Sequence, residues 1–410
     1  MQSTTGSWVS GEDFFDRESD LKILKHRIVG GNHILLTGHR RMGKTSLLQE
    51  IGRQLQHDGW TFLYCDLERA FEPEDVVAEI AATVQYGKPS SLRFFNRWLK
   101  RMRDSIEEIS FSEFRLKLRA EINDKNWTLL GENIIEEFSK QNKPTLLILD
   151  ELPVFLKRLV DQDGNALRVD LFLSWLRAEL QRSTKTRPVL VVSGSIGLAP
   201  LLRRLGMPEK INYLYSYQLH PWDKDDSIKC FELLAHSQEL YIENGVAEAV
   251  YETLGMGVPH HIQSFFARLN DYATQYHLDS ISIKDVSTVY HSEMLGPAGQ
   301  VDLDHYRSRL KNALCQKSFF IADIILTEVS TQSNFNQEGR AILEKIYGEI
   351  IEDISQHVEE VLDVLMHDGY LVSDNGGYKL AFRLLKDWWG GASYRDNYVP
   401  LSQLDQGSRS

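Results

Sequence analysis

Gly38-His39-Arg40-Arg41-Met42-Gly43-Lys44-Thr45 fits the pattern G-x-x-x-x-G-K-[ST]. An apolar run at 33–37 precedes it, and apolar residues at helical spacing follow it from 45 to 55. In such a strand–loop–helix the glycines let backbone N–H groups point at phosphate oxygens, and the helix N-terminus adds its positive dipole end. We predict that residues 38–45, with Ser46, bind nucleotide phosphates. Lys44 would reach the β- and γ-phosphates, and the Thr45 hydroxyl would ligate Mg²⁺.

A second apolar run, Leu146-Leu147-Ile148-Leu149, ends in the carboxylates Asp150 and Glu151. Ligands of open α/β sheets lie outside the carboxyl ends of the strands. We predict that Asp150 holds Mg²⁺ and that Glu151 is the general base for the attacking water. Two carboxylates after a strand are also typical of a solvated loop, but their place after the phosphate loop favours the catalytic interpretation.

The strand candidate after that one ends in Ser193-Gly194-Ser195. Ser193 or Ser195 would contact the γ-phosphate or the attacking water, and a helix cap or turn is the equally good alternative. Arg203 and Arg204 follow on a predicted helix. They are interpreted as surface charges, with an arginine finger toward a neighbouring subunit as the alternative.

Length and composition set outer limits. The chain has 410 residues, enough for two or three domains, and 46 basic against 58 acidic residues give a net charge of −12. This balance argues against a chain-wide nucleic-acid scaffold. Cys65, Cys230 and Cys315 form no CxxC pair, so neither a zinc site nor a disulfide framework is indicated, and a reducing cytoplasm is expected. No apolar run approaches the ~18 residues that span a bilayer.

Alternating strands and helices predict an α/β core with a parallel sheet. Its strand candidates are 33–37, 61–65, 145–149, 189–192 and 213–219. We predict a core at 1–220, a helical lid at 221–295, a winged-helix domain at 296–392 and a flexible tail at 393–410. The winged helix rests on a helix at 354–366 followed by two β-rich segments around Ser373-Asp374-Asn375-Gly376-Gly377, a hairpin signal.

Taken together, these motifs resemble the STAND/AAA+ group of P-loop ATPases, and in particular the archaeal-type ATPase family related to Orc/Cdc-type initiators. Further resemblances are the entry box from Phe15 to Leu21, the Gly257-Val258-Pro259 turn and the closing segment from Phe382 to Trp389. The similarity covers roughly 14–390.

The resemblance implies that ATP lies between core and lid, with Phe15 and Arg17 beside the adenine and Pro259 against the base or ribose. Gly-x-Pro is also an ordinary helix break. Where related initiators carry a sensor arginine on the lid, this chain has His260 and His261, which favours slow hydrolysis. Relatives of this kind are switches that often oligomerise on ATP, including sensors in antiviral defence.

Three functions remain open. The favoured one is an ATP-dependent switch that acts on a protein partner or a homo-oligomer. The second is a DNA-binding AAA+ ATPase: an initiator, loader or transposition regulator. It would use the basic, aromatic segment 91–103 or the helix 354–366. For 91–103 a core helix with a solvated basic face is the favoured interpretation, and phosphates would repel the acidic residues of 354–366. The third, a small-molecule kinase, leaves the lid and winged helix without a purpose.

Overall fold

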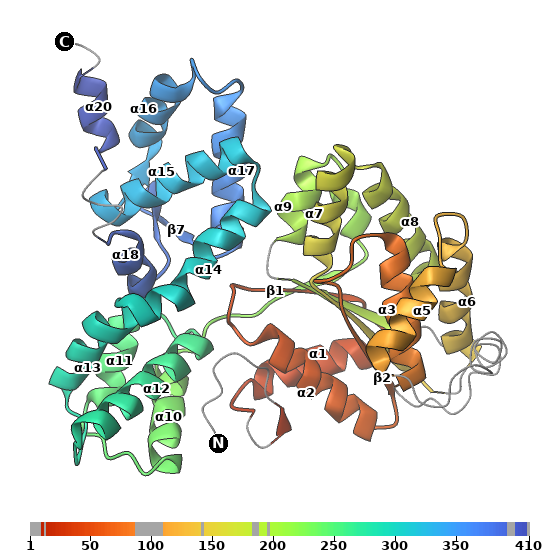
Figure 1. Cartoon of the computed structure of the whole chain (residues 1–410), viewed down its shortest axis with the longest axis horizontal. Helices are drawn as coiled ribbons and strands as arrows, with labels where there is room; N and C mark the ends of the chain where they lie inside the picture. The colour runs from red at the N-terminus through yellow and green to blue at the C-terminus, as the bar shows by residue number, and fades with distance from the viewer. Residues whose placement is uncertain are drawn as a thin grey trace.

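A computed structural model describes residues 10–11, 14–86, 110–140, 143–182, 188–194, 197–391 and 398–407. The basic segment 91–103 and Ser195 therefore lie outside the described residues. An α/β core occupies one side of the molecule, and a helical unit and a C-terminal unit lie together on the other side (Figure 1). Among the described residues, no helix combines the length and apolar character needed to cross a bilayer.

Five parallel strands form the core sheet, in the order β2-β3-β4-β1-β5. They are β1 (Ile34–Thr37), β2 (Thr61–Asp66), β3 (Thr145–Asp150), β4 (Val189–Ser193) and β5 (Tyr215–Gln218). The register pairs Leu36 with Ser193, and Asp66 with Asp150. The predicted parallel-sheet fold is confirmed. Because β4 lies between β1 and β3, Ser193 separates the end of β1 from the acid pair.

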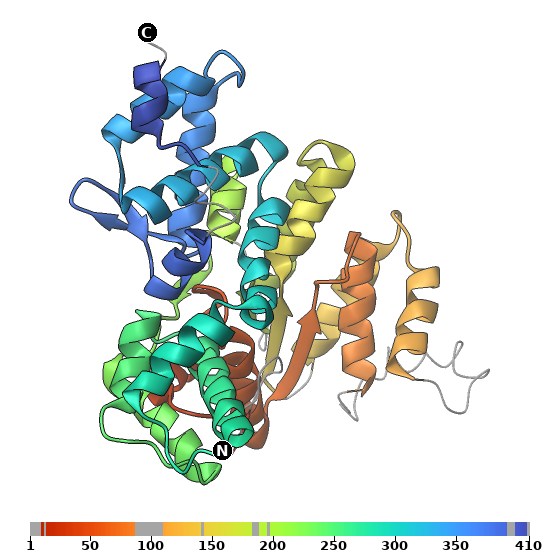
Figure 2. The same cartoon turned by 60° about the vertical axis from the view of Figure 1, so that its left-hand side comes forward.

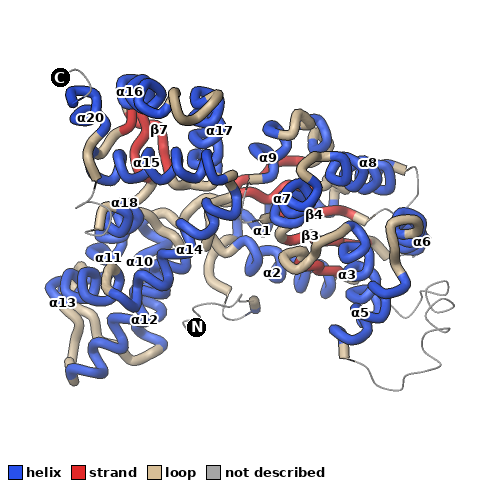
Figure 3. The backbone as a smooth tube through the Cα atoms, turned by 45° about the horizontal axis from the view of Figure 1, so that its top comes forward, coloured by secondary structure: helices blue, strands red, loops and turns tan. Residues whose placement is uncertain are grey.

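Apolar side chains alternate between the two faces of the sheet, so helices cover both. Ile148 and Val191 pack on α1 (Glu18–Val29) and α2 (Lys44–His57), while Leu149 and Val192 face the opposite helical layer. The opposite layer comprises α3 (Pro73–Tyr86), α5 (Phe111–Glu121), α6 (Trp127–Lys140), α7 (Leu152–Asp163), α8 (Leu167–Gln181) and α9 (Leu198–Arg204), with the short η2 (Pro208–Ile211) beside α8 and α9. Figure 3 shows the strands between these two helical layers.

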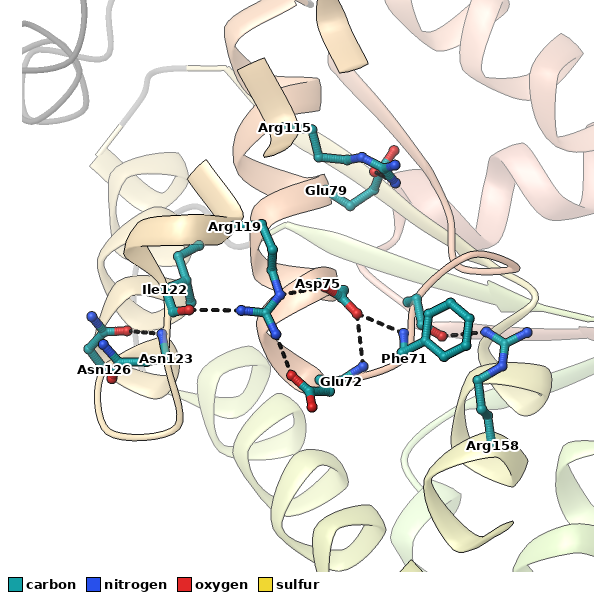
Figure 4. Close-up of polar contacts among 11 residues, drawn as sticks. Phe71, Glu72, Asp75, Glu79, Arg115, Arg119, Ile122, Asn123, Asn126 and Arg158 are labelled. Carbon is teal, nitrogen blue, oxygen red and sulfur yellow. Dashed lines mark hydrogen bonds and ion pairs between the residues drawn. The ribbon is translucent and has the colours of Figure 1, made fainter. Parts of the chain in front are cut away.

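Helices α3, α5 and α6 form an insertion between β2 and β3. Arg119 of α5 links α5 to the start of α3. Its guanidinium donates to Asp75, Glu72 and the carbonyl of Ile122 (Figure 4). A cavity of about 400 Å³ opens beside this clamp, lined in part by Arg119, Trp127 and Arg168. Both arginines of its lining are already paired, Arg119 with Glu72 and Asp75, and Arg168 with Asp163.

The helical unit contains α10 (Lys224–Ser237), α11 (Val246–Leu254), α12 (Pro259–Tyr276), α13 (Ile283–Val289) and η3 (Tyr290–Met294). The C-terminal unit contains α14 (Pro297–Ala313), α15 (Gln316–Gln332), β6 (Phe335–Asn336), α16 (Gln337–Tyr347), α17 (Ile354–His367), β7 (Leu371–Asp374), β8 (Gly377–Leu380), α18 (Arg383–Trp389) and α20 (Leu401–Gly407). One continuous hydrophobic core, running from Trp222 to Leu401, joins the two units. This shared core favours their moving as a single body.

In the C-terminal unit, β6, β8 and β7 form an antiparallel sheet. Asn375 and Gly376 turn the chain between β7 and β8 with positive φ values of 44° and 81°, as a tight hairpin requires. The stretch expected to be a flexible tail differs in part: residues 401–407 form α20, which packs on α16, and Leu401 is buried.

Candidate nucleotide site

The glycine-rich loop follows β1 and opens α2. Gly38 has a φ of +142°, and a Cβ there would lie 2.7 Å from the carbonyl oxygen of Leu219, so only glycine allows this close approach. Gly43 caps α2 with a φ of +82°, and no described heavy atom lies within 4 Å of the place its Cβ would take. Thr45 and Ser46 lie in the first turn of α2. The loop is therefore built as an anion cradle at a helix N-terminus.

Lys44 spans this loop. Its ammonium donates to the carbonyls of Gly38, at 2.7 Å, and His39, at 2.9 Å. Burial lowers the pKa of the amine, and the nearby Glu151 and Asp150 carboxylates partly offset that effect. The loop also anchors itself through Met42, whose side chain is buried in the core below α1 and α2. Only the backbone of Met42 is thus available to a nucleotide.

Asp150 accepts hydrogen bonds from several polar groups at the carboxyl ends of the strands. Its Oδ2 accepts from the hydroxyls of Thr45, at 3.0 Å, and Tyr64, at 2.7 Å. Its Oδ1 accepts from the hydroxyl of Ser193 and from the backbone N–H of Glu151. The carboxylate is 5% exposed. Four hydrogen bonds fix this carboxylate against the start of α2.

Glu151 follows with a left-handed backbone, φ 57°, and caps α7. Its carboxylate lies 3.6 Å from the guanidinium of Arg309, a residue of α14. The Thr45 hydroxyl and the Asp150 carboxylate are hard oxygen donors within 3.0 Å of each other, which suits Mg²⁺. The cradle, a buried lysine and an acid pair thus meet at one edge of the sheet.

Comparison with known families shows which family of proteins has this combination of residues. Residues 14–265, well over half of the chain, match the family described as an ATPase domain predominantly from Archaea. The chain belongs to this ATPase family. No curated protein matches the sequence.

Two solved structures show that the fold of this archaeal-type ATPase extends over nearly the whole chain. A Walker-type ATPase of Pyrococcus abyssi is 17% identical with a TM-score of 0.62, covering 95% of this chain and 99% of its own. The ORC2 protein of Aeropyrum pernix, in ADPNP–ADP complexes, is 14% identical with a TM-score of 0.56, covering 97% and 98%. At these identities the likeness concerns the fold.

The ATPase places its entry box against the phosphate loop. Arg17 is 8% exposed, and its guanidinium donates to the carbonyls of His220, at 2.6 Å, and Met42, at 3.3 Å. Arg17 therefore fixes the loop backbone, and its direct contact with nucleotide stays a prediction.

The Phe15 ring packs edge-on against Trp222, with 5.3 Å between centroids. Trp222 pairs with the Gly257-Val258-Pro259 turn through a 2.9 Å backbone hydrogen bond to Gly257. Pro259 is buried as the first residue of α12. The structure thus brings Phe15 and this turn together around Trp222; their contact with adenine is untested.

Other predicted residues have partners within the ATPase itself. Ser193 donates to Asp150, and its contact with phosphate or water stays a prediction. Arg203 forms a double hydrogen bond with Asp363 of α17, at 2.6 Å, and Arg204 donates to the carbonyl of Ala313, at 3.3 Å. Both arginines therefore join the core to the C-terminal unit. Neither of the two interpretations from the sequence, surface charges or an arginine finger, predicted this contact.

The C-terminal unit also lies directly against the phosphate loop. A Cβ on Gly369 would fall 2.1 Å from the ring of His39, so that ring fills the space glycine leaves. Arg41 donates to Nδ1 of His305 on α14, at 3.0 Å. Burial lowers the pKa of His39 to about 4, with Lys44 adding to the effect. His305 falls to a pKa of about 2 through burial and the nearby charge of Arg41. Both rings are neutral at pH 7.

Sequence reasoning missed Tyr64, Trp222, Gly369 and Arg309. Tyr64 lies within strand β2 and Arg309 within helix α14. A single tyrosine in a strand or a single arginine in a helix does not indicate a functional role in the sequence. The pairing of β2 with β3 and the docking of α14 bring them to the site.

Proposed function

We propose that the chain binds ATP with Mg²⁺, hydrolyses it slowly, and uses the bound triphosphate to set the position of the C-terminal unit against the core. The observation that carries this proposal is the convergence of Lys44, Thr45, Asp150 and Glu151 around the glycine-rich cradle. The family match and the nucleotide named with the Aeropyrum pernix structure support it.

Each side chain has a distinct task in this proposal. The backbone N–H groups of residues 38–45 and the Lys44 ammonium bind the phosphates. Thr45 and Asp150 would hold Mg²⁺, which when bound neutralises charge that develops on the phosphate oxygens. Glu151 takes a proton from the water that attacks the γ-phosphorus, and the bond from that phosphorus to the bridging oxygen breaks. ADP and inorganic phosphate leave.

Slow turnover follows from the partners that key groups already have. Lys44 must leave two loop carbonyls before it reaches phosphate. Glu151 lies beside Arg309. On α12, His260 and His261 stand where the resemblance to initiator ATPases implies a lid arginine. Burial lowers the pKa of both imidazoles. Neutral imidazoles stabilise a developing phosphate charge less than a guanidinium does.

The switching proposal rests on what contacts the phosphate loop. His39 and Arg41 contact the C-terminal unit, while Arg203 and Arg204 hold the same unit by α9. The helical and C-terminal units share one core. A γ-phosphate that rearranges the loop would therefore bias one interface, that between the core and this joint body.

We infer that the domain predicted at 296–392 is a winged helix, because a helix, a short strand, two helices and a hairpin follow one another within it. Its α17 packs on α9 and pairs Asp363 with Arg203. Because Asp363 of this helix already pairs with the core and its other acidic residues would repel phosphates, the helix is suited to protein contact, and we place a protein partner or a second copy of the chain ahead of DNA.

Two measurements test the proposal. Phosphate release from ATP should require Mg²⁺ and need no added phosphate acceptor, which a small-molecule kinase would demand. Mass measurement with ATP, ADP or neither, each with and without duplex DNA, should show a nucleotide-dependent change of assembly. A salt-sensitive DNA complex, with no change by nucleotide alone, would favour the initiator-type alternative.

A further inference from the structure

Helix α14 brings Arg309 to the acid pair from the C-terminal unit; Figure 2 shows α14 between that unit and the core. Its Nη2 lies 3.6 Å from Oε1 of Glu151 and 3.8 Å from Oε1 of Glu68. The side chain is 15% exposed. A guanidinium is therefore held beside the carboxylate proposed to activate water, although it belongs to another structural unit.

Positive charge gathers around this point. Arg40 and Arg41 of the phosphate loop lie close by, and burial together with the charges of Arg309 and Arg41 lowers the pKa of Arg40. Lys44 lies on the same loop. The acidic groups at this point are Glu151 and Glu68 beside Arg309, and Asp150, which is already bonded to three hydroxyls. An anion would relieve the repulsion between these cations.

Unused donors point the same way. Arg41 donates to Nδ1 of His305, and the other ring nitrogen of this neutral imidazole is Nε2. That atom and Nε of Arg309, which is always a donor, are both buried, and neither has a hydrogen-bond partner among the residues that the structure describes. Buried N–H groups normally have a partner, so the region between the loop and α14 is built for a group that accepts hydrogen bonds.

We propose that Arg309 binds the γ-phosphate of ATP in cis, as the triphosphate-specific contact of the site. This rests on the proposed function, since it takes the loop to bind ATP. We assign Arg309 to the γ-phosphate, and not to the α- or β-phosphate, because it lies beside Glu151. Glu151 would face the water that attacks the γ-phosphorus. Arg309 thereby ties the C-terminal unit to the nucleotide, because its helix moves with that unit.

The test is calorimetric titration of the full chain with ADP and with a non-hydrolysable ATP analogue, both with Mg²⁺. Arg309→Gln should weaken the triphosphate about tenfold or more and change ADP less than about twofold. Arg309→Lys should recover part of the loss. Arg307→Gln, on the same helix but paired with Asp323 of α15 at 3.0 Å, should match the wild type.

Arg203→Gln separates phosphate binding from domain docking, because it breaks the Asp363 pair and leaves the site intact. Thermal unfolding checks each variant, and Arg309→Lys serves if Arg309→Gln does not fold. The proposal is overturned by an equal loss for both nucleotides, by the same selective loss in Arg203→Gln, or by faster hydrolysis with unchanged triphosphate affinity. If the wild type binds neither nucleotide, the proposed function fails instead.

Discussion

The hydroxyl of Thr45 donates a 3.0 Å hydrogen bond to the carboxylate of Asp150, although 105 positions separate the two residues. Thr45 lies in the first turn of α2, the helix that follows the glycine-rich loop, and Asp150 ends β3, which is two strands away from β1 in the sheet. Their contact joins the phosphate cradle to the acid pair, and both halves of the proposed chemistry depend on it.

Glu151→Gln should retain ATP binding and lower hydrolysis by about a hundredfold or more, because an amide accepts no proton from water. Phosphate release and nucleotide titration measure the two effects separately. Asp161→Asn, on the exposed side of the same α7 and paired with Lys157, is the matched control. Wild-type turnover in Glu151→Gln would remove this residue from the mechanism.

Tyr64→Phe should raise the Mg²⁺ concentration that half-activates hydrolysis by a few fold. The variant removes one of the hydroxyl donors that fix Asp150, at a cost of about 1–2 kcal/mol in stability. Tyr217→Phe, on the edge strand β5, removes a hydroxyl that donates to Asp20 of α1, and should leave the Mg²⁺ dependence unchanged. An identical Mg²⁺ response in all three proteins would show that Tyr64 has no part in placing Asp150.

Gly369→Ala should destabilise the chain more than Gly376→Ala. Both glycines have positive φ, +78° and +81°, so the backbone penalty is similar. Only at Gly369 does the new methyl meet the His39 ring; around Gly376 no described atom lies within 4 Å. We expect an extra loss of about 1–3 kcal/mol in the free energy of unfolding. Equal losses, measured by urea unfolding, would contradict the packing of the C-terminal unit on the loop.

Acid should weaken the fold between pH 6.5 and 4. The pKa of His39 is about 4 in the folded chain against 6.5 for a free histidine, so in this window the unfolded chain binds more protons. The stability from the neutral ring is complete above pH 6.5 and falls by about 1.4 kcal/mol per pH unit toward pH 4. Because His260, His261 and His305 also have lowered pKa values and add to the slope, His39→Gln should reduce it by about 1.4 kcal/mol per pH unit without abolishing it. His57→Gln, with a 90% exposed ring, should leave the slope unchanged. An unchanged slope in His39→Gln would mean that its ring is not buried against Gly369.

The parts of the site that the sequence predicted are local. The order of glycines, Lys44 and Thr45 encodes a loop whose shape depends on its own backbone, and the apolar run before Asp150 encodes a buried strand end. The remainder depends on packing between distant segments. The sequence around Gly369 does not indicate that the His39 ring will occupy the space where a side chain would lie. The sequence around Arg309 does not indicate that α14 will pack beside Glu151. The strand order that puts Ser193 on Asp150 likewise follows from tertiary pairing.

Calorimetric titration of ATP into the wild type and into Lys44→Ala, with Mg²⁺ present, tests the phosphate-binding role of the loop. We expect one ATP per wild-type chain and a loss of affinity of about a hundredfold or more in Lys44→Ala. Lys25→Ala, which breaks a peripheral pair with Asp58, should bind as the wild type does. Equal binding by Lys44→Ala, or no binding by a folded wild type, would contradict the assignment of residues 38–45 as the nucleotide site.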